Sequence, residues 1–354
     1  MGLKQQLAQL FNQFNTSYSF VDFKTFSSGH INDTYLIITN SSINFVLQRI
    51  NSTVFKNPVG VIENKVKLTS YLLKKGVKTI QFVSTSENTF YVKSDETNYW
   101  CLSHYIKNSQ TYLKVNSKEI AYQAGLITGK FLACTSGFKE NIVDTLPRFH
   151  SMSFRFEEFS SALNSASELR KEKAKKWIDF ALTYKEEMFV LENAILNKEI
   201  PLRITHNDTK ISNILFDNNQ NAICLIDLDT IMNGCIHFDY GDALRTICST
   251  ANEDETDLNK IDFNFDYFKQ YTQGFFQSIK HLLTHTEINH LAVSPKIMTF
   301  IIGLRFLTDY LKNDIYYKIK YSEHNLDRAI NQFTLVKKLQ KQQFSISNYI
   351  RSLI

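Results

Sequence analysis

Residues 202–229 read LRITHNDTKISNILFDNNQNAICLIDLD. Short apolar runs separated by a polar loop and an Asn-rich turn predict three short strands, the last of which ends in a carboxylate. Asp208, Asn213 and Asp227 therefore emerge from the ends of neighbouring strands, where loops place functional groups on a rigid base. One carboxylate can accept the proton of an attacking hydroxyl, and amide and carboxylate oxygens can hold Mg²⁺. The segment predicts a site for phosphoryl transfer.

The spacing within this segment is specific. His206, Asp208 and Asn213 follow the pattern His-x-Asp-x-x-x-x-Asn, and Asp227 ends a strand 14 residues later, as in the catalytic loop and metal-binding aspartate of kinase-like folds. In the alternative, His206 is a packed core residue, Asp208 forms a turn and Asp227 is a surface cap. This alternative requires the catalytic-loop pattern and the following aspartate both to match by chance. A zinc site is disfavoured because no second His or Cys follows at ligand spacing.

Charged residues near this motif have less specific roles. Lys210 could reach the transferring phosphate, or it could be an ordinary solvated lysine. Asp229 could assist the metal or contact substrate. Asp239 and Asp242 stand at a predicted helix start, where a structural role is favoured over a metal-ligand role.

The N-terminal part of the chain predicts a nucleotide grip made of strands. Strands are expected at 20–26, 34–38 and 44–50, and the loop between the first two resembles a thinned phosphate-binding flap. The residues assigned to the nucleotide are Gly29, Asn32 and Thr34 in and beside the flap, Arg49 and Glu63 as a phosphate cation and its ion-pair partner, and Ser103 to Ile106, whose backbone could meet adenine. In the competing interpretation, the flap is the turn of a plain β-hairpin, and Arg49 and Glu63 are ordinary surface charges.

The remaining pattern predicts a two-lobed α+β protein, with a small β-rich N-terminal lobe and a larger, mainly helical C-terminal lobe. Further strands are expected at 90–93 and 99–106. Helices are expected at 60–75, along a stripe from Trp177 to Ile195, and at 265–283, 296–318 and 325–344. We divide the chain into a nucleotide-binding lobe, residues 1–105, and a lobe with the catalytic loop, metal site and substrate-binding helices, residues 106–354.

Composition excludes several classes of protein. The chain has 354 residues and a net charge of +5, too mild to indicate a nucleic-acid partner. Its most apolar stretch, Ile297 to Leu307, is too short to span a membrane and contains Arg305. Five scattered cysteines without a CxxC pair fit a reducing compartment, so we expect a cytoplasmic protein. The oligomeric state is left open.

Several segments together resemble the aminoglycoside phosphotransferase-like branch of the kinase-like superfamily, and within it the N-acetylhexosamine 1-kinases. They are THNDTKISN, IDLDTIMNG, FDYGDALR, STANEDE, GHINDTY and RFLTDYLKNDIYY, which span most of the chain. The resemblance implies ATP- and Mg²⁺-dependent phosphorylation of the anomeric (C1) hydroxyl of N-acetylglucosamine or N-acetylgalactosamine. Asn207 replaces the Gly usual between the His and Asp of the motif, and Asn tolerates left-handed backbone better than most residues.

The same resemblance assigns roles residue by residue. Asp208 would be the general base, Asn213 and Asp227 the metal ligands, and Arg305 and Tyr316 the sugar contacts. Apart from the resemblance, we add Lys210 to the catalytic candidates and Asp33, Asp229 and Asp309 to the substrate candidates. Arg305, Asp309 and Tyr316 are also spaced to share one face of a single helix. An intrahelical Arg–Asp pair beside a packed tyrosine is the alternative.

The nature of the acceptor is the main open question. Residues 318–354 hold seven Lys or Arg and two acids, so a polycationic aminoglycoside would be repelled if this segment lines the cleft, and a neutral sugar fits better. A kinase of another hydroxylated metabolite, such as choline, homoserine or a different sugar, is the second interpretation. A catalytically silent kinase-like binding module is the third, weakly favoured by Arg49 in place of the usual Lys.

Overall fold

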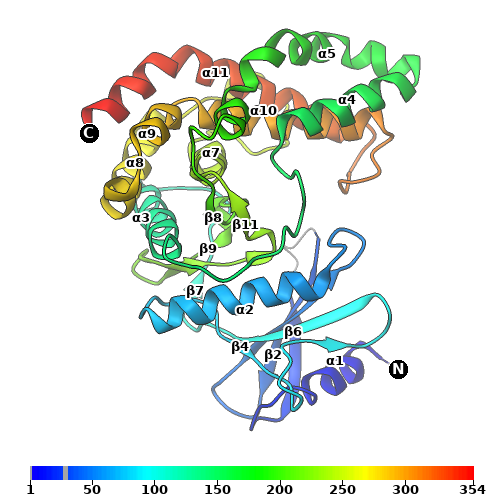
Figure 1. Ribbon diagram of the computed structural model, residues 1–354. Helices are drawn as coiled ribbons and strands as arrows, with labels where there is room; N and C mark the ends of the chain where they lie inside the picture. The colour runs from blue at the N-terminus through cyan, green and yellow to red at the C-terminus, as the bar shows by residue number, and fades with distance from the viewer. Residues whose placement is uncertain (1, 27–30) are drawn as a thin grey trace.

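The N-terminal lobe is built on one antiparallel sheet in this computed structural model, which describes residues 2–26 and 31–354 (Figure 1). The strands run in the order β1-β2-β3-β6-β4, and β5 also pairs with β6. Helices α1 and α2 accompany them. Their bounds are α1 Leu3–Phe11, β1 Phe20–Thr25, β2 Asp33–Thr39, β3 Phe45–Asn51, α2 Pro58–Lys74, β4 Phe82–Val83, β5 Val92–Lys93 and β6 Asn98–His104. The predicted strands and the helix at 60–75 are confirmed to within a few residues.

The two faces of this sheet pack against different helices. Leu47 of β3 belongs to the cluster formed with Leu7 and Phe11 of α1. Ile50 of β3 instead packs with Val61 of α2. Since successive side chains of a strand point to opposite faces, each residue of β3 is thereby assigned to the α1 face or the α2 face.

The C-terminal lobe is mostly helical and carries two small sheets, β10-β9-β7 and β11-β8. Figure 1 shows it above α2, with α4, α5 and α11 at its far end. The bounds are β7 Ser109–Gln110, α3 Lys118–Thr135, α4 Met152–Ser165, α5 Glu168–Met188, α6 Val190–Leu196, β8 Arg203–Thr205, η1 Ile211–Asn213, β9 Ile214–Asp217, β10 Ala222–Leu225, η2 Leu228–Thr230, β11 Met232–Gly234, α7 Ile236–Ile247, η3 Leu258–Lys260, α8 Phe265–Ile279, η4 Lys280–Leu282, α9 His285–Leu291, α10 Ser294–Leu311 and α11 His324–Ser352.

The core of this lobe explains its arrangement. Helix α10 is apolar on nearly all sides and is buried along most of its length, which is typical of a central helix. Helix α3 crosses α8 closely, because a Cβ on Gly125 would lie 1.9 Å from the carbonyl oxygen of Tyr271. In the described chain, no single helix is long and apolar enough to cross a membrane. Only α9 and α10 together reach that length and composition, and they are bent by 58° where they meet.

One predicted helix is wrong at its C-terminal end. The expected helix 296–318 stops at Leu311, because Asn313 and Asp314 adopt left-handed backbone, with φ of 66° and 59°. Tyr316 therefore lies in the connection to α11, and not on the helix face of Arg305 and Asp309. The predicted stripe from Trp177 to Ile195 is divided between α5 and α6 at Phe189.

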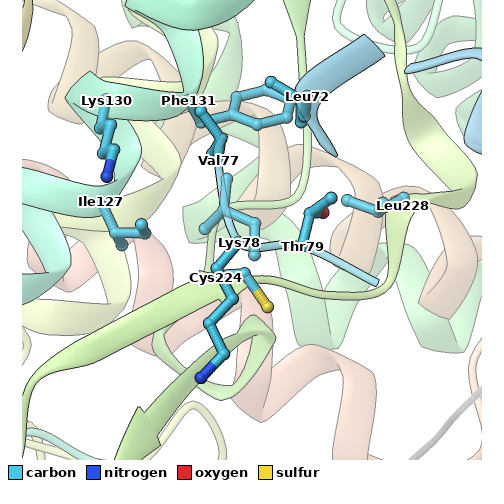
Figure 2. A pocket seen from close by; sticks show the side chains of 10 residues that line it. Leu72, Val77, Lys78, Thr79, Ile127, Lys130, Phe131, Cys224 and Leu228 are labelled. Atoms are coloured by element: carbon cyan, nitrogen blue, oxygen red, sulfur yellow. The ribbon is translucent and has the colours of Figure 1, made fainter. Parts of the chain in front are cut away.

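A small crevice marks one junction between the lobes. Figure 2 shows it enclosed by Leu72 at the end of α2, Phe131 of α3 and Leu228, with Lys78 and Cys224 nearby. Its volume of about 10 Å³ is close to the minimum for a single water molecule. We therefore interpret it as lobe packing and not as a ligand site.

Candidate active site

The catalytic loop lies between β8 and η1, and hydrogen bonds between its backbone and the side chains of Asp239 and His206 hold it in place. The Asp239 carboxylate of α7 accepts hydrogen bonds from the backbone N–H groups of His206 and Asn207, at 2.9 and 2.7 Å. The ring of His206 contacts the Ile226 carbonyl through Nε2, and its Nδ1 accepts the backbone N–H of Asp208. His206 and Asp239 thus act as the scaffold of the loop, which agrees with the structural role favoured for Asp239.

Asn207 gives this loop its sharp turn. Its φ is 65°, in the left-handed region that Asn tolerates better than most residues. Its side-chain amide donates to the carbonyl of Thr230 at 2.9 Å, and its Oδ1 accepts the Thr205 hydroxyl at 3.1 Å. The side chain therefore supports the backbone conformation that the usual glycine would adopt without strain.

The turn directs Asp208 toward Lys210 and Asn213. One oxygen of Asp208, Oδ2, accepts Lys210 Nζ at 2.8 Å and Asn213 Nδ2 at 2.9 Å. In the described part of the chain, the other oxygen, Oδ1, has no hydrogen-bond partner. Burial acts to raise the pKa of Asp208, but the Lys210 ammonium outweighs it and holds the pKa below the usual range. Asp208 is therefore ionised at neutral pH, with one oxygen free to accept a proton.

Asp227 lies beside Asn213 because of the strand register. The Ile226 N–H donates to the Asn213 carbonyl at 2.9 Å, which places the next residue, Asp227, alongside Asn213. Asp227 has left-handed backbone, with φ of 59°. Burial, together with the charge of Asp229, raises the pKa of Asp227 to about 7.

These two side chains fit a magnesium ion by their donor chemistry. The Asn213 amide nitrogen is bound to Asp208, so its oxygen points the other way, and the Asp227 carboxylate has no hydrogen-bond partner among the described residues. Residues 2–26 and 31–354 contain no group of three or more His, Cys, Asp or Glu side chains that could hold a metal. Two protein ligands suit Mg²⁺, which is usually bound by one or two carboxylates plus substrate phosphates.

Asp229 makes contacts that the sequence pattern did not reveal. It is buried, its Oδ1 accepts Lys65 Nζ of α2 at 2.5 Å, and its Oδ2 accepts the side-chain amide of Asn32. Lys65 also donates to Gln48 Oε1 at 2.9 Å. Burial acts to lower the pKa of Lys65, but the Asp229 charge outweighs it and raises the pKa. Sequence reasoning missed Lys65. Its position within a helix of otherwise mixed polarity gave no signal of its own.

The predicted ion pair between Arg49 and Glu63 is wrong. Arg49 lies on the α1 face of β3 with Leu47, where it pairs with Asp33 and donates to Asn98 at 2.6 Å. Glu63 is 3.8 Å from Lys67 on the same helix. Gln48, the next residue toward the α2 face, stands where a strand cation would face the cleft.

The other predicted nucleotide and substrate residues of the N-terminal lobe do not all lie on the same face of the sheet. Thr34 pairs with Gln48 in register and shares its face, whereas Asp33 lies with Arg49 on the opposite face. Ser103 is paired on both sides, to β3 and β4, so its backbone is already occupied. The chain leaves the sheet after His104, and the Ile106 carbonyl accepts the Ser109 hydroxyl at 2.5 Å. Gly29 lies outside the described residues.

Arg305 of α10 lies among aromatic side chains. Its guanidinium lies 5.0, 5.7 and 5.6 Å from the ring centroids of Phe149, Tyr316 and Tyr317. Burial acts to lower the pKa of Arg305, but surrounding groups, Asp208 among them, outweigh it and raise the pKa. The structure thus brings Arg305 and Tyr316 together, although on different elements.

Asp309 has a structural role in place of the predicted sugar contact. Its carboxylate accepts the backbone N–H groups of Tyr316 and Tyr317, both at 2.9 Å, and the side-chain amide of Asn325 at 2.9 Å. These bonds occupy both oxygens and fix the connection after α10. Asp309 therefore places the two tyrosines over Arg305 and is not free to bind a hydroxyl.

A cavity of about 220 Å³ lies behind the catalytic loop. Its lining includes Asn207 and His150, apolar residues of α6 and α10 such as Leu191 and Ile301, and the charged residues Asp144, Arg148 and Glu192. His150 Nε2 contacts the Asn207 carbonyl at 3.0 Å, so this ring links the cavity wall to the loop backbone.

The fold and site define a two-lobed, kinase-like phosphotransferase: an N-terminal sheet over a C-terminal lobe that presents a carboxylate, an amide and a second carboxylate. A family model described as "Phosphotransferase enzyme family" matches residues 22–268, which is more than half of the chain. The chain belongs to this family.

Solved structures share the fold over nearly the whole chain. A spectinomycin phosphotransferase in complex with ADP and spectinomycin has a TM-score of 0.60 at 14% identity, with 96% of this chain and 98% of that chain covered. An amicoumacin kinase in complex with AMP-PNP and Ca²⁺ has 0.62 at 12%, covering 100% and 98%. A microcompartment-associated aminopropanol kinase has 0.60 at 12%, covering 97% and 98%. At these identities the similarity establishes the kinase-like fold.

Proposed function

We propose that this protein is a cytoplasmic, ATP- and Mg²⁺-dependent kinase that phosphorylates the anomeric hydroxyl of an N-acetylhexosamine. The observation that supports this acceptor class is Arg305, a cation close enough to Asp208 for the two charges to interact, and in this proposal the acceptor binds beside both. The sugar itself is taken from the resemblance of the sequence to N-acetylhexosamine 1-kinases.

The charges around Arg305 favour a neutral acceptor. Glu158, whose charge acts on Arg305, is itself paired with Arg155 at 2.5 Å. A cationic acceptor would meet the Arg305 guanidinium, whose close neighbours are aromatic rings, and like charges disfavour binding. Guanidinium donors and tyrosine rings instead suit hydroxyl and carbonyl oxygens and the apolar face of a sugar.

Asp208 is the residue that accepts the proton. The acceptor oxygen forms a bond to the γ-phosphorus, the bond from that phosphorus to the β–γ bridging oxygen breaks, and ADP leaves. The hydroxyl proton moves to Asp208 Oδ1, the oxygen left free while Oδ2 is held by Lys210 and Asn213. Lys210 thereby orients the base and brings a positive charge near the transferred group.

The nucleotide and metal occupy the cleft between the lobes in this proposal. Asn213 and Asp227 would hold Mg²⁺, which neutralises charge on the phosphates when bound. Asn32 and Thr34 would border the phosphates, and the backbone after His104, including Ile106, would meet adenine. Support comes from the presence of ADP and AMP-PNP in the similar phosphotransferase and kinase structures.

An acceptor panel tests the proposal. The purified protein is incubated with ATP and Mg²⁺ and, separately, with N-acetylglucosamine, N-acetylgalactosamine, glucose, homoserine, choline and spectinomycin, and products are identified by phosphorus NMR. We expect a sugar 1-phosphate from the N-acetylhexosamines. Homoserine is the main rival, since its carboxylate would be attracted to Arg305. Turnover with homoserine or another alcohol alone would refute the sugar assignment, and ATP binding without any turnover would support a silent binding module.

A further inference from the structure

Helix α2 is fastened to the C-terminal lobe by two consecutive residues. The Asn64 amide donates to the carbonyls of Val143 and Ile231, at 2.8 and 3.1 Å. Lys65 donates to Asp229 at 2.5 Å. Ile231 directly follows the η2 turn that contains Asp229, so both anchors hold the same short segment of the C-terminal lobe.

The contact between Lys65 and Asp229 is buried and closed. Only 3% of the Lys65 side chain and 5% of the Asp229 side chain are exposed. Asp229 also accepts the amide of Asn32, which lies just before β2, and Lys65 also donates to Gln48 of β3. Two separate segments of the N-terminal lobe therefore bind one carboxylate of the other lobe, and a third segment, through Gln48, holds the lysine. Because a buried charge without its partner is strongly destabilised, neither residue can leave this contact alone.

The Lys65–Asp229 contact supplies a positive charge that β3 does not place on its α2 face. On the α2 face of β3 the neutral Gln48 accepts a hydrogen bond from Lys65, and the Arg49 cation lies on the α1 face. The positive charge on the cleft side of the N-terminal lobe thus comes from a helix, through Lys65. Its partner Asp229 stands two residues after the candidate metal ligand Asp227, so displacement of one would shift the other.

We propose that the Lys65–Asp229 pair is the latch between the lobes on which nucleotide binding depends, with Lys65 acting as a positioning residue through Asp229. The nucleotide site has one wall in each lobe, with Asn213 and Asp227 below and Asn32 above, and the latch sets their separation. This inference rests on the nucleotide-binding part of the proposed function and is independent of the sugar.

Nucleotide binding and lobe separation can be measured without any acceptor. The variants are Lys65→Met, Asp229→Asn and the double variant, with Lys65→Arg as the conservative replacement. Lys67→Met, on the exposed side of the same helix, is the matched control. ADP affinity is measured by calorimetry with and without Mg²⁺, and the radius of gyration by small-angle X-ray scattering. Because no sugar is used, a wrong acceptor assignment would leave the result unaffected.

We expect each single variant to weaken ADP binding at least tenfold and to enlarge the radius of gyration. The double variant should lose about as much as one single variant, because both substitutions break the same contact. Lys65→Arg, which keeps the charge but is larger, should lose less ADP affinity than Lys65→Met, and Lys67→Met should match the wild type. If Lys65→Met does not fold, Asp229→Asn and the double variant, which leaves no unpaired buried charge, provide the same comparison. Wild-type ADP affinity in these variants, or losses that multiply in the double variant, would overturn the proposal.

Discussion

Replacement of Asp208 by Asn separates its chemical role from its structural one. The oxygen of the new amide can take the place of Oδ2 and keep both hydrogen bonds, from Lys210 at 2.8 Å and from Asn213 at 2.9 Å. The NH₂ group then takes the place of Oδ1, the oxygen assigned to accept the proton. A donor thus replaces the one free acceptor, while the contacts that hold the loop persist.

The expected loss follows from this geometry. General base catalysis contributes typically about 10²–10⁴-fold, so kcat of Asp208→Asn should fall by that factor, or by about 3–5 kcal/mol of transition-state stabilisation. ADP affinity should change by less than about threefold, and the melting temperature should stay within a few degrees of the wild type, because the loop keeps its contacts.

Steady-state kinetics with the best acceptor, calorimetry with ADP and a thermal melt measure these three quantities. Asp179→Asn, an exposed position on α5, is the matched control and should behave as the wild type. A kcat within a few fold of the wild type would remove Asp208 from its role as base. A large loss of ADP affinity would mean that Asp208 acts mainly on the nucleotide site.

Three further predictions test other parts of the structure. Arg305→Met should raise KM for the acceptor about 10–100-fold and leave KM for ATP unchanged, because charge-assisted hydrogen bonds to the sugar are lost. Equal changes in the two KM values would contradict the proposed contact between Arg305 and the acceptor. Burial raises the pKa of Asp239 to about 6 from 3.8, so the folded state binds the extra proton, and the contribution of Asp239 to the free energy of unfolding should fall, by up to about 3 kcal/mol, as pH rises from 4 to 6. Denaturant unfolding of Asp239→Asn should lack this fall, and parallel curves for the two proteins would refute it. Gly125→Ala should destabilise by about 1–3 kcal/mol or more, because its Cβ would collide with the Tyr271 carbonyl, whereas Gly2→Ala, in open space, should not lower the melting temperature.

The parts of the site that were predictable lie close together in the sequence. Asp208 and Asn213 belong to one loop, and the β9–β10 register carries Asp227 to the same place. Their mutual position depends on local turns and one hairpin, which residue type and spacing specify well. The left-handed conformation of Asn207 is likewise a local property. The scaffold role favoured for Asp239 needed only its position at a helix start.

The errors involve contacts between distant segments. The alternation of side chains along a strand correctly placed Arg49 and Leu47 on one face of β3. Only the packing of α1 against that face shows that it is turned away from the cleft. Lys65 is 164 residues from Asp229, and no sequence pattern links them. Arg305 and Tyr316 do meet, through a chain reversal after Leu311 and the hydrogen bonds of Asp309, and not through the continuous helix that the apolar spacing suggested.

The sequence by itself determined the two-lobed α+β fold and the catalytic loop, because hydrophobic periodicity and turn residues act over a few positions and are written directly in the chain. Only the tertiary structure decided that Lys65, and not Arg49, meets Asp229, and that Arg305 and Tyr316 come together. Those choices depend on which buried charges find partners, and the free energy of a buried charge is set by groups that folding brings near it from elsewhere in the chain.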